Sequence, residues 1–167
     1  MDVFFEQIVP LKKTAKDYLL ISLTVIGALS LCAACIFFSG ALPILLPLTV
    51  LIIYGAIKLL ARFNKEVEYI VTNGSVDFDV ITAKSSRKRV ITFECKDILR
   101  GGKYNPANPV KTDANETLIL GNVQNAKYVL VKRGGKKYLI VFSPNDKIIS
   151  GIKQGAPREM SRDLFND

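Results

Sequence analysis

The longest apolar stretch of the chain covers residues 18–57 and contains no Asp, Glu, Lys or Arg. It is about twice the ~20 apolar residues that one membrane-spanning helix requires. A cluster of turn-forming residues at positions 39–43 divides it near the middle. The pattern predicts a transmembrane helical hairpin over residues 17–63, with one helix from Asp17 to Phe38 and a second from Leu42 to Arg62.

After residue 63 the spacing of apolar residues changes to the alternation that is typical of β-strands. Alternating runs flank Asn73-Gly74 and also Gly134-Gly135, and both pairs favour tight β-hairpin turns. Between these hairpins, residues 101–116 form a polar stretch without periodicity. A structureless loop of this length predicts either mobility or a function of its own.

A final amphipathic helix is predicted after Ser143-Pro144, because Ile148, Ile149 and Ile152 form an apolar stripe at helical spacing. The β domain is expected to cover residues 64–155, including this helix. Residues 1–16 mix apolar residues with three lysines and a proline, which predicts an interfacial or disordered leader. Residues 156–167 are expected to be a loose polar tail.

Six or seven strands followed by one amphipathic helix are typical of a pleckstrin-homology-like (PH-like) barrel. Residues 68–74 (Glu-Tyr-Ile-Val-Thr-Asn-Gly) are similar to the first hairpin of membrane-anchored bacterial PH-like domains. Phe142-Ser143-Pro144 is similar to the entry of their last helix. The chain thus resembles small bacterial membrane proteins of unassigned function that combine a two-helix anchor with a PH-like domain.

This resemblance implies a membrane-anchored α+β fold. An N-terminal transmembrane helical hairpin is expected to precede a PH-like antiparallel β-barrel, which a C-terminal helix caps. The barrel architecture implies a binding role, although function does not transfer automatically with a fold.

The net charge of +8 lies entirely after residue 57. The predicted turn between the helices has no basic residue, whereas basic residues flank both helices: Lys12, Lys13, Lys16, Lys58, Arg62 and Lys65. By the positive-inside rule, the protein is expected to be multi-pass in the cell membrane, with both termini and the β domain in the cytoplasm. A cleaved signal peptide is disfavoured, because its apolar core is only ~7–15 residues long.

Basic residues gather at two predicted turns and are the candidates for binding lipid head groups. They are Lys84, Arg87, Lys88 and Arg89 in one group, and Lys132, Arg133, Lys136 and Lys137 in the other. Near a bilayer, each such residue attracts anionic head groups by ~1 kcal/mol. The alternatives are ordinary solvated turn residues, or nucleic-acid binding, which the predicted anchor argues against.

Small residues in the apolar run, namely Gly27, Ala34 and Gly55, are candidates for close packing against another helix. The apolar run has no ionisable residue of the kind that marks a transport path. Cys32 and Cys35 have the spacing of a redox or metal motif, but their predicted position at membrane depth favours an ordinary apolar role.

Catalytic chemistry has little support in the sequence. The chain has no His, the commonest general base and metal ligand near neutral pH. Two carboxylate pairs, Glu66 with Glu68 and Asp77 with Asp79, alternate with apolar residues and are therefore expected on a solvent face. Asp113 and Glu116 lack the spacing of a calcium loop. No catalytic residue, metal or cofactor is predicted.

The predicted function is a non-enzymatic, membrane-anchored PH-like module. It is expected to bind a protein partner or anionic lipid head groups at the inner leaflet, through an edge strand or the 101–116 loop. The alternative is a structural or regulatory subunit of a larger membrane complex, packed through the transmembrane hairpin. The expected partners are the bilayer and either a second protein or further copies of the chain, but not nucleic acid.

Overall fold

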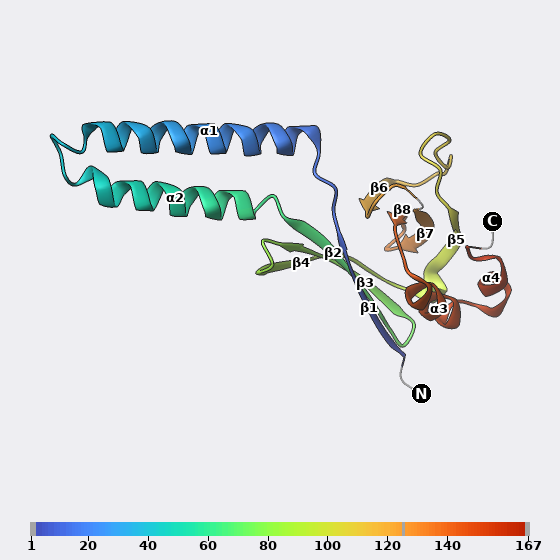
Figure 1. Cartoon of the computed structure of the whole chain (residues 1–167). Helices are drawn as coiled ribbons and strands as arrows, with labels where there is room; N and C mark the ends of the chain where they lie inside the picture. The colour runs from blue at the N-terminus through green and yellow to red at the C-terminus, as the bar shows by residue number, and fades with distance from the viewer. Residues whose placement is uncertain (1–2, 125, 166–167) are drawn as a thin grey trace. The chain divides into compact units, whose positions relative to one another are not determined.

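The computed structural model describes residues 3–124 and 126–165 and consists of two compact units (Figure 1). The helical unit comprises residues 13–65 and 82–85. The sheet unit comprises residues 1–12, 66–81 and 86–167. In sequence, the helical unit is therefore an insertion after the first segment of the sheet unit.

The helical unit contains α1 (Ala15–Phe38) and α2 (Leu45–Ala61), which pack against one another. Thr14 begins α1 with a capping box, in which its hydroxyl accepts from the Asp17 N–H and the Asp17 carboxylate accepts from the Thr14 N–H at 2.7 Å. Pro47 lies in the first turn of α2, where its missing N–H breaks no helical hydrogen bond.

Apolar side chains cover the helical unit on all sides. Leu23, Phe37 and Val50 are 67%, 81% and 66% exposed, and many similar side chains are exposed with them. A helix on the surface of a soluble protein usually has one apolar stripe and one polar face. By length and composition, α1 is able to cross a membrane, whereas α2 is apolar but has only 17 residues.

The first sheet has the order β1-β2-β3-β4, with β1 (Phe4–Pro10), β2 (Lys65–Thr72), β3 (Ser75–Thr82) and β4 (Ser86–Glu94). The prediction of a leader over residues 1–16 was wrong where β1 forms. This strand pairs antiparallel with β2 from Phe4↔Thr72 to Pro10↔Glu66. The physical reason is a short alternation, since Phe5 and Val9 pack against the core whereas Phe4 and Ile8 are exposed.

The second sheet has the order β5-β7-β8-β6, with β5 (Ile98–Lys103), β6 (Glu116–Leu120), β7 (Lys127–Arg133) and β8 (Lys136–Phe142). A short 3₁₀ turn at Cys95–Asp97 connects it to β4. The prediction of an antiparallel barrel was wrong in two respects. The structure has two separate four-stranded sheets, and β6 runs parallel to β8.

The two sheets and α3 (Asp146–Gly155) enclose one core. Its centre is aromatic: the Tyr69 ring lies 5.1 Å from the Phe78 ring and 5.6 Å from the Phe142 ring. Asn145 caps α3 by accepting the Ile148 N–H at 2.9 Å, and Ile148 and Ile152 are fully buried as the sequence predicts. The turns at Asn73-Gly74 and Gly134-Gly135 also form, all four residues having positive φ.

The prediction of a loose tail over residues 156–167 was wrong as far as residue 165. Arg158–Asp163 forms the short helix α4, and the next two residues, Leu164 and Phe165, are only 1% and 5% exposed. Leu164 fits over β5 because Gly101 has no side chain. A Cβ at position 101 would lie 2.5 Å from the Leu164 Cδ2. Apolar anchors after the helix therefore hold this segment on the sheet.

The long polar loop covers the other face of the second sheet. Tyr104, Val110 and Ala114 pack against a second apolar cluster, formed by Ala126, Tyr128, Leu130, Leu139 and Val141. The Asn115 N–H donates to the Lys137 carbonyl, and the Asn115 side chain accepts from the Lys137 N–H, both at 2.8 Å. The loop thus has a structural role, since it shields the sheet from water on this face.

Candidate functional site

The predicted basic cluster at the β3–β4 turn is largely committed to ion pairs within the sheet unit. Arg87 donates to the Glu68 carboxylate at 2.8 Å, and Arg89 donates to Asp79 at 2.9 Å. Arg89 also lies 3.2 Å from an Asp77 oxygen. Lys88 is exposed on β4, and Lys84 lies in the turn with a positive φ of 56°.

These arginines explain why the prediction of a solvent face was wrong for Glu68 and Asp79. Alternation puts both carboxylates on the face opposite the core, yet their side chains are only 1% and 3% exposed. Arg87 reaches from β4 past β3 to β2, so the two guanidinium groups and the carboxylates lie against one another on this face.

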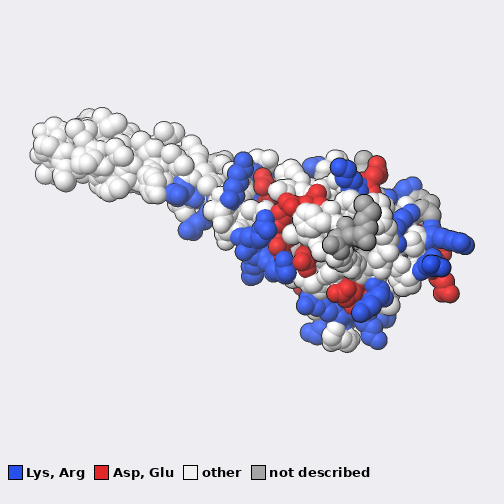
Figure 2. Space-filling view, turned by 90° about the horizontal axis from the view of Figure 1, so that it is seen from below, with Lys and Arg blue, Asp and Glu red and all other residues white. Residues whose placement is uncertain are grey.

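The electrostatics of Glu68 are unusual within this group. Burial raises the pKa of Glu68 above its ordinary value, and the neighbouring Glu6 side chain raises it further, while Arg87 acts in the opposite direction. The second carboxylate oxygen of Glu68 is buried without a hydrogen-bond partner among the described residues. Figure 2 shows acidic side chains close to Lys and Arg side chains on the face in view.

The second predicted basic cluster lies at the β7–β8 turn and consists of like charges in register. Lys132 pairs with Lys137 across the two strands, and Arg133 pairs with Lys136. Like charges directly opposite one another destabilise a strand pair. Lys137 is partly compensated by an ion pair with Asp113, which also lowers the pKa of Asp113. The side chains of Lys132, Arg133 and Lys136 are exposed.

The predicted helix-packing residues do not mediate the contact between α1 and α2. Apart from the adjoining residues and backbone of the same helix, no heavy atom among the described residues lies within 4 Å of an ideal Cβ at Gly27 or Gly55, and Ala34 is exposed. Substituting a larger residue at either glycine would therefore meet open space within this unit.

Cysteines and acidic residues are the remaining candidates for catalytic or metal-binding chemistry. The cysteines are free thiols, and burial raises the pKa of Cys95 to about 12, which keeps it protonated and unreactive. Among the described residues no group of three or more His, Cys, Asp or Glu is arranged to hold a metal ion.

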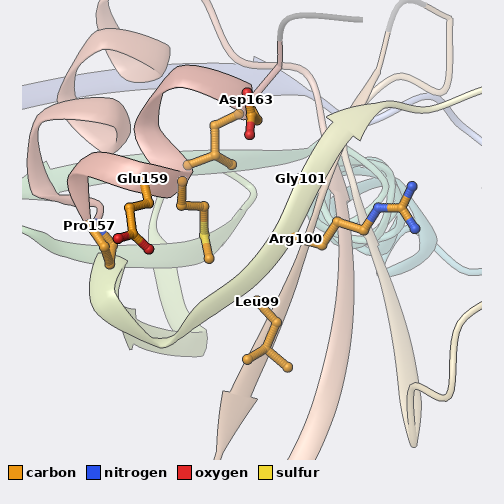
Figure 3. A pocket seen from close by; sticks show the side chains of 8 residues that line it. Leu99, Arg100, Gly101, Pro157, Glu159 and Asp163 are labelled. Atoms are coloured by element: carbon orange, nitrogen blue, oxygen red, sulfur yellow. The ribbon is translucent and has the colours of Figure 1, made fainter.

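A pocket between β5 and α4 was missed by sequence reasoning. It has a volume of about 500 Å³ and is lined by Leu99, Arg100, Gly101, Pro157, Glu159, Met160, Asp163 and Leu164 (Figure 3). Figure 3 shows Glu159 and Asp163 on the helical side, while the Arg100 side chain points away from the helix. The available signal was Pro157 followed by Met160 and Leu164 at helical spacing.

Comparison with known proteins identifies one family. The family model described as Bacterial PH-like domain (DUF6106) matches residues 1–162, a range that includes the inserted helices as well as the sheets. No curated protein and no solved structure matches the chain.

Proposed function

Because the chain belongs to the bacterial PH-like domain family DUF6106, we propose that it is a non-enzymatic binding module that its helical unit anchors in the membrane. PH-like domains are generally binding modules without catalytic activity. The sheet unit would present its surfaces to a protein partner at the inner leaflet.

One observation carries this proposal: two apolar helices are inserted between two strands that pair with each other. β1 precedes α1, β2 follows α2, and the two strands are neighbours in one sheet. If α1 alone crossed a bilayer, β1 and β2 would lie on opposite sides of it and could not pair. A crossing by α1 therefore requires a return, and α2 is the segment available for it.

The lengths of the helices are compatible with a two-pass anchor. At ~1.5 Å per residue, α1 spans ~36 Å and α2 spans ~26 Å, against a hydrocarbon core of ~30 Å. The apolar residues Leu42 and Ile44 precede α2 and would extend its apolar surface toward the outer head groups. A slight local thinning of the bilayer would accommodate the remaining mismatch.

The charges support an orientation with both termini and the sheet unit in the cytoplasm. Basic residues flank the outer ends of the helix pair, whereas residues 39–44 between α1 and α2 contain none. Figure 2 shows Lys and Arg at one end of an otherwise uncharged helical surface. The linkers 11–14 and 62–64 contain only four and three residues. Because an extended residue covers at most ~3.6 Å, both linkers are short.

Site-directed labelling tests this topology. Gly40→Cys places a thiol in the turn between the helices, and Lys136→Cys places one at the β7–β8 turn, both in a background without Cys32, Cys35 and Cys95. With a membrane-impermeant maleimide, Gly40→Cys should react in intact spheroplasts and Lys136→Cys only after lysis. Equal reactivity of both sites, or release of the protein from membranes by alkaline carbonate, would contradict the proposal.

A second candidate function is contact of the β7–β8 turn with anionic head groups, because its like charges repel one another until an anion approaches. In nanodiscs containing the full chain, a dye at Gly135→Cys should be quenched by labelled anionic lipid and less so at high salt. Arg133→Gln with Lys136→Gln should abolish the quenching, whereas Lys111→Gln with Lys147→Gln should not. Quenching that is independent of lipid charge would exclude this function.

The alternative of a subunit in a larger membrane complex rests on the open space at Gly27 and Gly55. Gly27→Leu or Gly55→Leu should then reduce the mass of the complex in native electrophoresis, because a neighbouring helix could no longer approach closely. Leu23→Ala, which removes an exposed side chain without blocking the backbone, is the matched control. An unchanged mass in all variants would exclude this alternative.

A further inference from the structure

The structure points to a specific binding surface, and this inference rests on the proposed binding function. We propose that the groove between β5 and α4 binds an extended segment of a partner protein. The segment would add as a strand to the outer edge of β5. One of its apolar side chains would enter the pocket, and a basic residue beside it would face Glu159 and Asp163.

The edge of β5 is suited to strand addition. β5 is the first strand in the order β5-β7-β8-β6, so one of its edges pairs with β7 and the other has no strand partner in the described part of the chain. Unpaired backbone N–H and C=O groups on such an edge are a template for another extended chain. The glycine pair Gly101-Gly102 lies within this strand.

Leu99 marks the centre of the proposed surface. The register between β5 and β7 shifts between Ile98 and Arg100, which leaves Leu99 without a partner across the pair. Its side chain is 44% exposed, next to the pocket. β-Bulges of this kind commonly redirect a side chain at a functional edge.

The pocket supplies the specificity. Its volume of about 500 Å³ is within the ~300–1,000 Å³ range of pockets that enclose ligand groups. Leu99, Met160 and Leu164 provide an apolar lining, while Pro157 marks the end at which α4 begins. This combination fits an apolar side chain of an extended peptide.

The charge of the groove selects the flanking residue of that peptide. Glu159 and Asp163 are one helical turn apart on α4 and both line the pocket, so the helical wall is acidic. Arg100 does not neutralise this wall, because its side chain points away from α4 (Figure 3). A lysine or arginine in the bound segment would complement the two carboxylates.

The edge of the other sheet at β4 is less suitable. Arg87, Lys88 and Arg89 follow one another along it, and charged side chains on an edge strand oppose the pairing of a second chain. The edge at β6 is the appropriate internal comparison. It has an exposed apolar residue, Ile119 at 53%, but Ile119 does not line the pocket.

Selection of displayed random decapeptides on the full chain in nanodiscs tests the inference. The selected peptides should share an apolar residue next to Lys or Arg. Leu99→Arg or Met160→Arg should weaken their binding at least tenfold, measured by fluorescence anisotropy. Ile119→Arg should leave it unchanged. Circular dichroism melts of Leu99→Arg should match those of the wild type, since Leu99 is already partly exposed.

Backbone methylation distinguishes strand addition from simple pocket binding. Two versions of a selected peptide are compared, with N-methyl groups at the odd-numbered or at the even-numbered amides. One version should lose binding and the other should keep it, because only one of these two sets of amides faces β5. If both methylated versions still bind, strand addition is overturned.

The outcomes separate the two proposals. If the selected peptides bind to Leu99→Arg and Met160→Arg as tightly as to the wild type, the groove is overturned but the proposed binding function is not. If no peptide is selected and the nanodisc dye assay reports lipid contact, the groove fails and the lipid function remains. If neither peptide nor lipid binds, both the groove and the proposed binding function fail.

Discussion

At the scale of single residues, the ion pair between Arg87 and Glu68 connects two strands that are not neighbours in their sheet. Burying a carboxylate is costly unless a cation and hydrogen bonds compensate for the lost hydration. Here Arg87 contacts one carboxylate oxygen, while the other has no partner in the described part of the structure. Compensation is incomplete, which is consistent with the raised pKa of Glu68.

This imbalance predicts how stability depends on pH. Because the pKa of Glu68 is higher in the folded than in the unfolded protein, folding takes up a proton there. The resulting stabilisation is complete below the unfolded pKa of ~4.5 and is lost as pH rises through the folded pKa. As pH rises through this window, the unfolding free energy of the wild type should therefore fall relative to that of Glu68→Gln.

Urea unfolding of the full chain in detergent, followed by circular dichroism from pH 4 upward, measures this difference. Glu66→Gln is the matched control, since it makes the same chemical change at a partly buried position of the same strand. Parallel pH profiles of the wild type and Glu68→Gln would show that Glu68 does not take up the proton.

At the scale of elements, the sequence predicted best where the pattern is local. The long apolar run, the Asn-Gly and Gly-Gly turns and the apolar stripe of α3 all depend on residues close together in sequence. The parallel pairing of β6 with β8 has no such signal, because it depends on the path of residues 104–115 around the sheet. The alternation around Glu68 indicates on which face of the sheet this residue lies, but it does not indicate that Arg87 covers the Glu68 side chain.

The terminal elements were missed for a related reason. Residues 4–10 and 158–163 are too short for a period to be clear, and both are stabilised by tertiary contacts rather than by local propensity. The β5–α4 pocket could not be predicted once the C-terminal residues were interpreted as a loose tail. For the basic cluster at the β3–β4 turn, the sequence did not indicate that Arg87 and Arg89 are engaged in ion pairs.

Two adjacent phenylalanines test β1 directly. Phe5 packs against the core and its ring lies close to Gly151, whereas Phe4 is 61% exposed. Phe5→Ala should lower the unfolding free energy by roughly 2–4 kcal/mol, because it leaves a cavity. Phe4→Ala should change it by no more than ~0.5 kcal/mol. A disordered or interfacial leader would give equal, small effects in chemical unfolding of the full chain.

At the scale of the whole molecule, the insertion of the helices determines which fragment can fold. A fragment of residues 64–167 lacks β1, and with it the core contacts of Phe5 and Val9. It also lacks Gln7, whose side chain bonds to Ser143 and Asn145 at 3.0 and 2.7 Å. Replacing residues 13–65 by a short turn keeps these contacts, because Pro10 and Glu66 are already partners.

The bridged chain should therefore be monomeric by gel filtration and unfold cooperatively, whereas the 64–167 fragment should aggregate or melt at a lower temperature. The bridged chain carrying Phe5→Ala is the control that separates loss of β1 packing from the presence of the new turn. Equal melting temperatures of the fragment and the bridged chain would show that β1 contributes nothing to stability.

The separation of β1 from β2 in the chain also has a consequence for biosynthesis. β1 leaves the ribosome first, and its partner β2 emerges only after both helices have been made, so the first sheet cannot be completed earlier. In a membrane-anchored protein, a molecule in which only one helix had inserted would retain β1 and β2 on opposite sides of the bilayer. Its unpaired strand would be exposed to proteases, so under the proposed anchoring only molecules with both helices inserted would complete the sheet.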